Sequence, residues 1–111
     1  MTDLSIVIVS YRGRDLTLAC LASLQREVRA RKDAGALETE VFVVDNGSDD
    51  GTVEAVQRDF PWAKIIALPR NVGFARGCNA ALREASGRHA LLLNNDTVVS
   101  RGALEACVAH L

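Results

Sequence analysis

The sequence predicts an α/β fold, with a parallel, Rossmann-like sheet and helices on both of its faces. Four short runs rich in β-branched residues and leucine alternate with stretches of helical periodicity along the 111 residues. The first run, LSIVIV, is continuously apolar, which is typical of a strand covered on both faces. Strands that alternate with helices are joined by right-handed crossovers and are therefore parallel. The predicted order is β-α-β-α-β-α-β-α within one domain.

The first half of the chain supplies two strands, over residues 4–9 and 40–44, with a helix between them. Apolar residues recur in that helix every four positions, which places them on one helical face. This face consists of Leu16, Cys20, Leu21, Leu24 and Val28. Residues 29–39 are rich in charge and contain a glycine, so they are predicted to end the helix and form a surface loop.

A second helix and a third strand come next. Asp50 is the predicted N-cap of the helix, and Pro61 ends it. The apolar face of this helix consists of Val53, Val56 and Phe60. The third strand, over residues 63–68, stops at Pro69 because proline lacks the backbone N–H that a strand interior needs.

The third helix has the clearest apolar stripe of the chain, and Gly87 lies where a C-cap glycine belongs. The stripe consists of Phe74, Cys78, Ala81, Leu82 and Ala85. A fourth strand is predicted over residues 89–93. Ser100 is the predicted N-cap of a last helix, whose apolar residues are Leu104, Cys107 or Val108, and Leu111.

Composition excludes several classes of function. The formal net charge is −1 and no block of Lys and Arg stands out, so we expect no nucleic-acid partner. The longest apolar runs fall well short of the ~20 residues that span a bilayer, and no signal peptide is recognisable. The three cysteines are odd in number and widely spaced, which argues against a disulfide framework and a zinc site. We expect a cytoplasmic protein whose cysteines are small apolar residues on helix faces.

Polar residues follow every predicted strand. In sheets of this kind ligands bind beyond the carboxyl ends of the strands, so these segments are expected to converge on one crevice. They bring two acids that suit a ligand, Asp45 and Asp96. The four segments are Ser10-Tyr11-Arg12, Asp45 through Thr52, Pro69 through Gly73, and Asn94-Asn95-Asp96-Thr97.

Three familiar site types are missing from these segments. The turn after the first strand, SYRGRD, has a single glycine, so the G-x-G-x-x-G fingerprint of dinucleotide binding is absent. A Walker A loop is absent as well. The acid cluster of a receiver domain is not found at the end of the first strand. An aromatic residue and two carboxylates remain, one suited to ribose or base and one to a divalent metal.

Four segments in order resemble the N-terminal half of a family 2 glycosyltransferase of the inverting GT-A type. SIVIVSYRGRDLTLACLASL resembles the opening strand, turn and helix of that family, and VFVVDNGSDDGT is similar to its D-[DN]-G-S-x-D-G-T. NVGFARGCNAAL resembles the version common in the rhamnosyltransferase-like branch, and LLLNNDT fits the place of the D-x-D motif. The resemblance covers essentially the whole chain and implies that it binds a nucleotide-sugar donor, UDP- or dTDP-linked.

The resemblance implies nucleotide-binding roles at three strand ends. Asp45 would accept hydrogen bonds from a uracil or thymine imide or from ribose, since a carboxylate is an acceptor only. Its structural alternative is an Asx-type turn. The floor of the base pocket would consist of Val9, Ser10 and Tyr11; for Tyr11 the alternative is a partly buried side chain with a hydrated hydroxyl. Asn71 through Gly73 would present free N–H groups at a helix N-terminus, unless Asn71 only makes a turn.

Asp96 is the predicted metal ligand. A divalent cation, Mg²⁺ or Mn²⁺, would lie between its carboxylate and the two phosphates of the donor. Asn94 stands where the family usually has its first aspartate. It can still donate a hydrogen bond to ribose or phosphate, but it brings no charge, so tight metal binding before substrate arrives is in question. The structural alternative for both residues is a turn made by their own side chains.

The general base of inverting transfer has no candidate in this chain. By resemblance it is a carboxylate in the C-terminal half, expected beyond residue 111. Residues 1–111 are therefore expected to be the truncated, nucleotide-sugar-binding half of the domain, inactive alone and prone to form a homodimer through uncovered apolar surface. The full-length enzyme would transfer sugar to a glycan or lipid-linked acceptor, in polysaccharide biosynthesis. The alternative is a catalytically silent nucleotide-binding or interaction module with the same fold.

Overall fold

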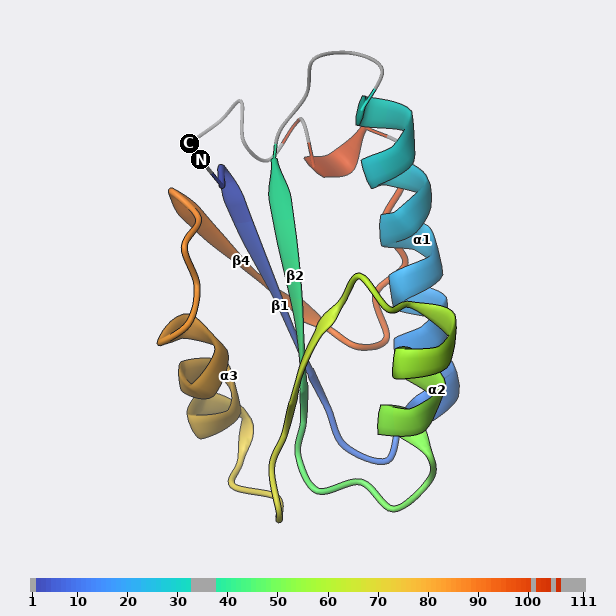
Figure 1. Ribbon diagram of the computed structural model, residues 1–111, viewed down its shortest axis with the longest axis vertical. Helices are drawn as coiled ribbons and strands as arrows, with labels where there is room; N and C mark the ends of the chain where they lie inside the picture. Colours follow the sequence, from blue (N-terminus) through green and yellow to red (C-terminus); the bar gives the residue numbers. More distant parts are fainter. Residues whose placement is uncertain (1, 33–37, 101, 105, 107–111) are drawn as a thin grey trace.

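A four-stranded parallel sheet forms the centre of the protein, as predicted (Figure 1). The computed structural model describes residues 2–32, 38–100, 102–104 and 106. The strand order is β3-β2-β1-β4, so the chain starts in the interior of the sheet and builds outward in both directions. The elements are β1 (Leu4–Ser10), α1 (Arg14–Lys32), β2 (Thr39–Asp45), α2 (Thr52–Asp59), β3 (Lys64–Ala67), α3 (Phe74–Leu82) and β4 (His89–Asn94).

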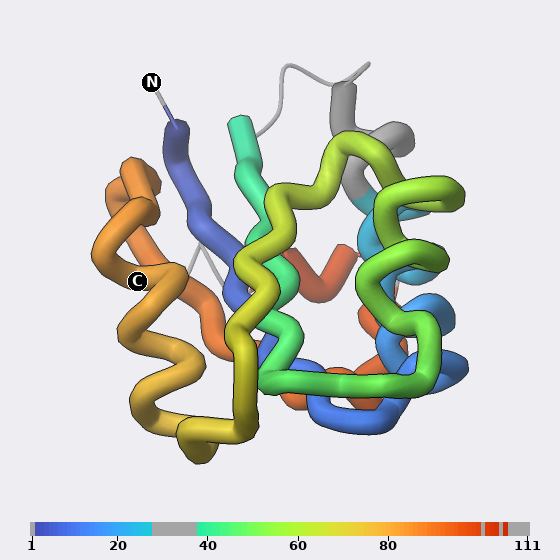
Figure 2. Tube along the Cα trace, turned by 60° about the horizontal axis from the view of Figure 1, so that its bottom comes forward, coloured from blue at the N-terminus to red at the C-terminus, as the bar shows by residue number. Residues whose placement is uncertain are grey.

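Helices cover both faces of the sheet. α1 and α2 lie side by side on one face, and α3 lies on the other, over β1 and β2 (Figures 1 and 2). Alternate residues of each strand therefore enter two separate cores. Ile6 and Val43 belong to the core under α1 and α2, whereas Val7 and Val44 belong to the core under α3. This double burial explains why the β1 and β2 sequences are apolar at successive positions.

The edge strand β4 is less covered than the sequence suggests. No helix among the described residues lies over its α3-side face, and Leu92 is 46% exposed there. On the opposite face Leu91 and Leu93 pack against the larger core. The apolar run ALLL thus has one buried and one exposed side, a distinction that a run of identical leucines does not reveal.

The third helix differs most from its prediction. It ends at Leu82 rather than near Ala85, and Phe74, at its first position, is 53% exposed instead of facing the core. Gly87 is not its C-cap. A Cβ at Gly87 would lie 2.5 Å from Ser5 Oγ, and the Gly87 N–H donates to that oxygen at 2.8 Å, so glycine is needed there for close packing.

The length of α1 and the N-cap of α2 differ from those predicted. α1 begins at Arg14 and extends to Lys32, further than the apolar pattern indicates. The N-cap residue of α2 is Gly51, at φ 82°, and Asp50 accepts from the Thr52 N–H at 3.2 Å instead. Beyond β4, Leu104 is buried in the larger core, as its place in the predicted stripe requires. Cys107, Val108 and Leu111 lie outside the described residues.

Cys20 and Cys78 are buried free thiols, which agrees with their predicted packing role. Burial raises the pKa of Cys20 to about 11, and the negative charge of Asp96 adds to the increase. Burial also raises the pKa of Cys78. Cys107 lies outside the described part of the chain. None of the helices described here combines the length and apolar character that crossing a bilayer requires.

A buried carboxylate joins the amino-terminal ends of the strands. Glu40 accepts hydrogen bonds from Ser5 Oγ at 2.5 Å, from the Ser86 N–H at 2.7 Å and from Lys64 Nζ at 2.9 Å. Burial by itself raises the pKa of Glu40, but the hydrogen bonds from Ser5, Ser86 and Lys64 outweigh it and bring the pKa down to about 2. The ionised Glu40 therefore ties β1, β2 and β3 to the loop that enters β4.

Candidate functional site

The carboxyl ends of the strands meet at one edge of the sheet because the register aligns them. Ser10 pairs with Asp45 between β1 and β2, and Val9 pairs with Asn94 between β1 and β4. The side chains of Val9 and Asn94 share the α3-side face, since paired residues point the same way. At this edge, beside the start of α3, the surface is hollow.

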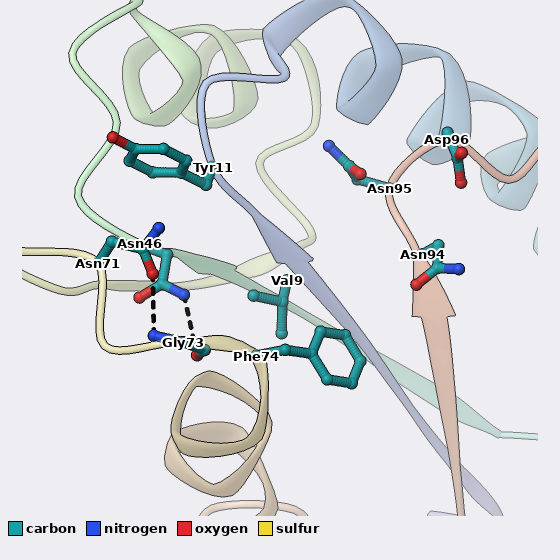
Figure 3. Close-up of a pocket in the computed structure, with 9 residues that line it drawn as sticks. All are labelled: Val9, Tyr11, Asn46, Asn71, Gly73, Phe74, Asn94, Asn95 and Asp96. Atoms are coloured by element: carbon teal, nitrogen blue, oxygen red, sulfur yellow. Dashed lines mark hydrogen bonds between the residues drawn. The ribbon is translucent and has the colours of Figure 1, made fainter.

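The hollow is a pocket of about 390 Å³, within the size range of small-molecule sites. Tyr11, Asn46 and Asn71 lie on one side of it and Asn94 through Asp96 on the other, with Val9 and Phe74 between them (Figure 3). Six of the residues singled out from the sequence line this one pocket. They are Val9, Tyr11, Asn71, Gly73, Asn94 and Asp96.

Ser10 and Asp45 do not line the pocket. Both are buried, with Asp45 only 2% exposed, and the strand alternation directs their side chains to the face that carries α1 and α2. Ser10 Oγ lies 2.8 Å from Thr17 Oγ1 of α1. Asp45 Oδ2 accepts from the Ser48 N–H at 3.0 Å, while Oδ1 is buried without a hydrogen-bond partner among the described residues. The structure thus shows the turn interaction that was the alternative for Asp45.

Three residues that sequence reasoning did not single out complete the pocket: Asn46, Phe74 and Asn95. A signal for Asn46 was available, since the residue after a buried strand-end residue points to the opposite face. Phe74 was assigned to the apolar stripe of α3 because it keeps the helical spacing. Asn95 also reaches α1, where its Nδ2 lies 3.4 Å from Thr17 Oγ1.

Tyr11 forms an aromatic wall of the pocket, and the side chain of Arg12 packs against its ring. The Arg12 guanidinium carbon lies 5.1 Å from the centroid of its ring, which is cation–π distance. The Arg12 side chain forms an ion pair with Asp49, with Nε 3.3 Å from Oδ1. The backbone N–H of Arg12 donates to Ser48 Oγ at 2.8 Å. The turn after β1 is thereby held against the turn after β2.

A second connection between these two turns runs through Asp50. Its Oδ2 accepts from the Arg14 N–H at 3.2 Å, and its Oδ1 accepts from Thr52 Oγ1 at 2.5 Å. The hydrogen bond from Thr52 is the largest contribution that lowers the pKa of Asp50, and the Arg14 N–H adds to it. Asp50 therefore stays ionised at neutral pH and holds the start of α1 against the start of α2.

The loop before α3 continues the wall on which Tyr11 lies. Asn71 Oδ1 accepts from the Gly73 N–H at 2.9 Å, an Asx-type turn, and Asn71 also lines the pocket. Gly73 is the N-cap residue of α3 and has φ 89°, a conformation that favours glycine. The N-terminus of α3, with its free N–H groups, begins at the pocket wall.

A hard divalent cation fits the acidic side of this pocket. Asp96 supplies the only carboxylate among the lining residues, and Asn94 and Asn95 add neutral amide oxygens. Within the described ranges, no group of three His, Cys, Asp or Glu side chains is placed to hold a metal. One carboxylate is sufficient where phosphate oxygens of a ligand complete the coordination, as is common for Mg²⁺.

Comparison with known proteins identifies relatives of the whole chain. The family described as glycosyl transferase family 2 matches residues 5–111. An uncharacterised glycosyltransferase of Bacillus subtilis, YfnE, is 33% identical over 100 residues, 87% of this chain and 24% of that protein. An N-acetylglucosaminyltransferase of a Bradyrhizobium strain is 30% identical over 105 residues, 90% of this chain and 65% of that protein.

Solved structures give the same result for the fold. TarS 1–349 of S. aureus in complex with UDP-GlcNAc superposes with a TM-score of 0.81 at 26% identity, over 97% of this chain and 30% of that one. A mannosyltransferase of Pyrobaculum calidifontis in complex with GDP-Man and Mn²⁺ gives 0.78 at 26% identity, over 95% and 31%. This chain spans less than two thirds of the relatives it matches. The rhamnosyltransferase-like branch is not confirmed, because several relatives are named as N-acetylglucosaminyltransferases.

Proposed function

This chain belongs to glycosyl transferase family 2, and we propose that its pocket binds the nucleoside diphosphate of an activated sugar. The observation that carries the proposal is a pocket at the carboxyl ends of the strands, which combines an aromatic wall, a helix N-terminus and one carboxylate. The TarS complex with UDP-GlcNAc has the same fold over 97% of this chain. A nucleotide at this place also agrees with the general rule for open α/β sheets.

Each wall of the pocket suits a different part of that ligand. The exposed face of Tyr11, which is 42% exposed, offers a surface on which a nucleobase can stack. Asn71 and the N-terminus of α3 offer donors for a base carbonyl or a phosphate. Asn94 can donate to ribose or phosphate on the other side. We propose UDP as the preferred nucleotide, in line with the donor in the TarS complex, and dTDP as the second candidate.

Asp96, together with an amide oxygen of Asn94, would hold Mg²⁺ or Mn²⁺ against the diphosphate. When bound, the cation would neutralise the charge that builds up on the departing nucleoside diphosphate. The residues of the chain bind and orient the donor: Tyr11 fixes the base, and the neighbouring loop before α3 holds the nucleotide beside it. Transfer with inversion, to a hydroxyl of a glycan or lipid-linked acceptor, is proposed for the whole protein.

Titration calorimetry of UDP and dTDP, with and without Mn²⁺, tests the proposal on the wild type and on Asp96→Ala. We expect UDP to bind, Mn²⁺ to strengthen binding by at least tenfold, and Asp96→Ala to remove most of that increase. Asp59→Ala is the matched control, because it removes an exposed carboxylate on α2 that pairs with Arg58. Absence of nucleotide binding in the wild type contradicts the proposal.

The alternative function, a catalytically silent nucleotide-binding module, predicts a different result in the same experiment. In that case the nucleotide binds equally well with and without Mn²⁺, and Asp96→Ala changes nothing. Asn94, a neutral residue at the place of an acid, is the feature that keeps this second function open. The family membership favours the enzyme.

A further inference from the structure

Three buried polar side chains lie along the side of α1 that contacts the segment after β4. They are Thr17, Ser23 and Glu27. At about 100° per residue, their positions fall within roughly a third of the helix circumference. A buried polar group is costly unless it is hydrogen-bonded. The segment after β4, which runs behind α1 in Figure 1, supplies one donor to each of them, and the donor to Glu27 is the Gly102 N–H.

The other two hydrogen bonds lie closer to the pocket. Asn95 Nδ2 donates to Thr17 Oγ1 at 3.4 Å, and the Val99 N–H donates to Ser23 Oγ at 2.9 Å. Ser23 Oγ is itself fixed, since it donates to a carbonyl of its own helix at 2.7 Å. Thr17 and Ser23 are 0% and 1% exposed, so water cannot take over as the partner of either hydroxyl.

These two hydrogen bonds enclose the turn that carries Asp96. The Thr97 N–H donates to the Asn94 carbonyl at 3.1 Å, so Asn95 and Asp96 are the two central residues of a β-turn. Asn95 is half-buried and reaches α1, whereas Asp96 is exposed at the pocket (Figure 3). One hydrogen bond holds the residue before Asp96, and the other holds Val99, three residues after it. The place of the Asp96 carboxylate therefore depends on α1.

The backbone before α1 confines Asn95 further. A Cβ at Gly13 would overlap Asn95 Nδ2, so the amide of Asn95 lies directly on that backbone. Because the amide nitrogen faces Thr17, the amide oxygen is left for the pocket. Ser10 Oγ lies 2.8 Å from Thr17 Oγ1 and connects the same contact to β1. The turn after β4 is thus held by α1 and β1 as well as by its own hydrogen bond.

We propose that Thr17 and Ser23 are positioning residues, which set the affinity of the pocket for its divalent cation by holding the turn of Asp96 on both sides. This inference rests on the proposed function. Neither hydroxyl lines the pocket, so each acts through the turn. Because Asp96 is the only carboxylate among the lining residues, no second acid compensates if it moves. A cation such as Mg²⁺ demands near-ideal ligand geometry, so a small displacement of the carboxylate weakens it.

Four variants separate positioning from stability. Thr17→Val keeps the volume of the side chain and removes the acceptor of Asn95, whereas Thr17→Ser keeps the hydroxyl and should rescue. Ser23→Ala removes the acceptor on the other side of the turn. Ser5→Ala is the matched control, because it removes a buried, hydrogen-bonded hydroxyl at the opposite end of β1, next to Glu40.

Calorimetry measures UDP affinity with and without Mn²⁺, and the ratio of the two affinities is the quantity compared. We expect Thr17→Val and Ser23→Ala each to lower this ratio about fivefold, the loss that corresponds to one hydrogen bond. The affinity for UDP without Mn²⁺ should stay at the wild-type value. Thr17→Ser and Ser5→Ala should keep the wild-type ratio. A purely structural role would destabilise the variants in urea and leave the ratio unchanged.

A double-mutant cycle with Asn95→Ala tests whether Thr17 acts through Asn95. Asn95 is half-buried, so this variant is expected to fold even if Thr17→Val does not. Asn95→Ala should lower the ratio by itself, and Thr17→Val should lower it no further in the Asn95→Ala background. Independent losses that add in the double variant would overturn the positioning role of Thr17, as would a wild-type ratio in Asn95→Ala.

The same titrations distinguish failure of this inference from failure of the proposed function. A wild-type ratio in both Thr17→Val and Ser23→Ala would overturn the inference and leave the proposed function standing. A wild-type chain that binds UDP equally well with and without Mn²⁺ would overturn the inference and favour the silent module. A wild-type chain that binds neither UDP nor dTDP would overturn the proposed function, and the inference with it.

Discussion

The guanidinium of Arg12 lies over the ring of Tyr11, 5.1 Å from its centroid, on a backbone whose φ of 51° is unusual for a residue with a side chain. That conformation costs about 1 kcal/mol, and it is compensated by the bonds that Arg12 makes to Ser48 and Asp49. The position of the aromatic wall therefore depends on a residue that does not itself line the pocket.

Replacement of Arg12 by alanine tests this dependence. Arg12→Ala is expected to weaken UDP binding by about two- to fivefold, the loss that corresponds to one partly exposed cation–π contact. Calorimetry measures the affinity, and Arg58→Ala serves as the control because its ion pair with Asp59 is exposed on α2. Equal affinity of Arg12→Ala and wild type would show that Tyr11 does not need this support.

Glu40 predicts a specific dependence of stability on pH. Its pKa is lowered from 4.5 to about 2 in the folded protein, so its contribution to stability is complete above pH 4.5 and is lost as pH falls toward 2. Glu40→Gln should lower the free energy of unfolding at pH 7 by about 2 kcal/mol, since it removes the charge from a buried, multiply bonded group. Urea unfolding at pH 7, 4 and 3 measures both effects.

The control for Glu40 is Asp59→Asn, which neutralises a carboxylate in an exposed ion pair and should leave the free energy of unfolding nearly unchanged. The difference between wild type and Glu40→Gln is expected to shrink at pH 3. A difference that stays constant from pH 7 to pH 3 would mean that the ionisation of Glu40 does not stabilise the fold.

Two glycines with nearly the same φ provide a matched test of close packing. Gly47 (φ 81°) and Gly51 (φ 82°) both have left-handed backbone conformations. Alanine at either position would be strained, which lowers stability by about 1 kcal/mol. Only Gly47→Ala also drives a Cβ into backbone, at Arg70, whereas the nearest atom to a Cβ at Gly51 is 3.7 Å away. Thermal or urea unfolding should therefore show Gly47→Ala to be at least about 1 kcal/mol less stable than Gly51→Ala. Equal losses would place the loop before α3 further from the turn after β2.

Cys20 is expected to resist alkylation. Its pKa of about 11 leaves almost no thiolate at pH 8, and it is completely buried. Iodoacetamide labelling of the native protein, followed by peptide mass spectrometry, should leave Cys20 unmodified until the protein is unfolded in urea. Rapid labelling of Cys20 under native conditions would show that α1 opens locally at this position.

The fold was predictable because four apolar runs and three amphipathic stretches agree with one topology. The predictions that were wrong concern residues whose sequence pattern fits two different structural roles. Leu92 looks like its buried neighbours until the cover of β4 is known, and Phe74 keeps the helical spacing of the apolar stripe while facing the pocket. Gly87 is a plausible cap by position, but its role is contact with Ser5, a residue 82 positions away.

The candidate site was predictable to the level of strand ends and no further. Tyr11, Asn71 and Asp96 lie around one pocket because the carboxyl ends of parallel strands share an edge. Assignment of Ser10 and Asp45 to the same pocket neglected the alternation of side chains along a strand, which sends both to the other face. The hydrogen bonds of the Asn46 side chain to Val72 and Gly73 depend on how β2 and the loop before α3 are placed in the fold, which local sequence does not encode.

The Glu40 cluster and the pocket lie at opposite ends of the same strands. Ser5 and Ser10 mark these ends on β1, five residues or about 16 Å apart. Directed evolution can exploit this separation. Mutations that raise the melting temperature can be sought around Glu40, while libraries diversify the turns at the other end to alter donor choice. The effects of mutations this far apart on stability are usually additive. The two searches can therefore run in parallel, and their results can be combined in a final recombination step.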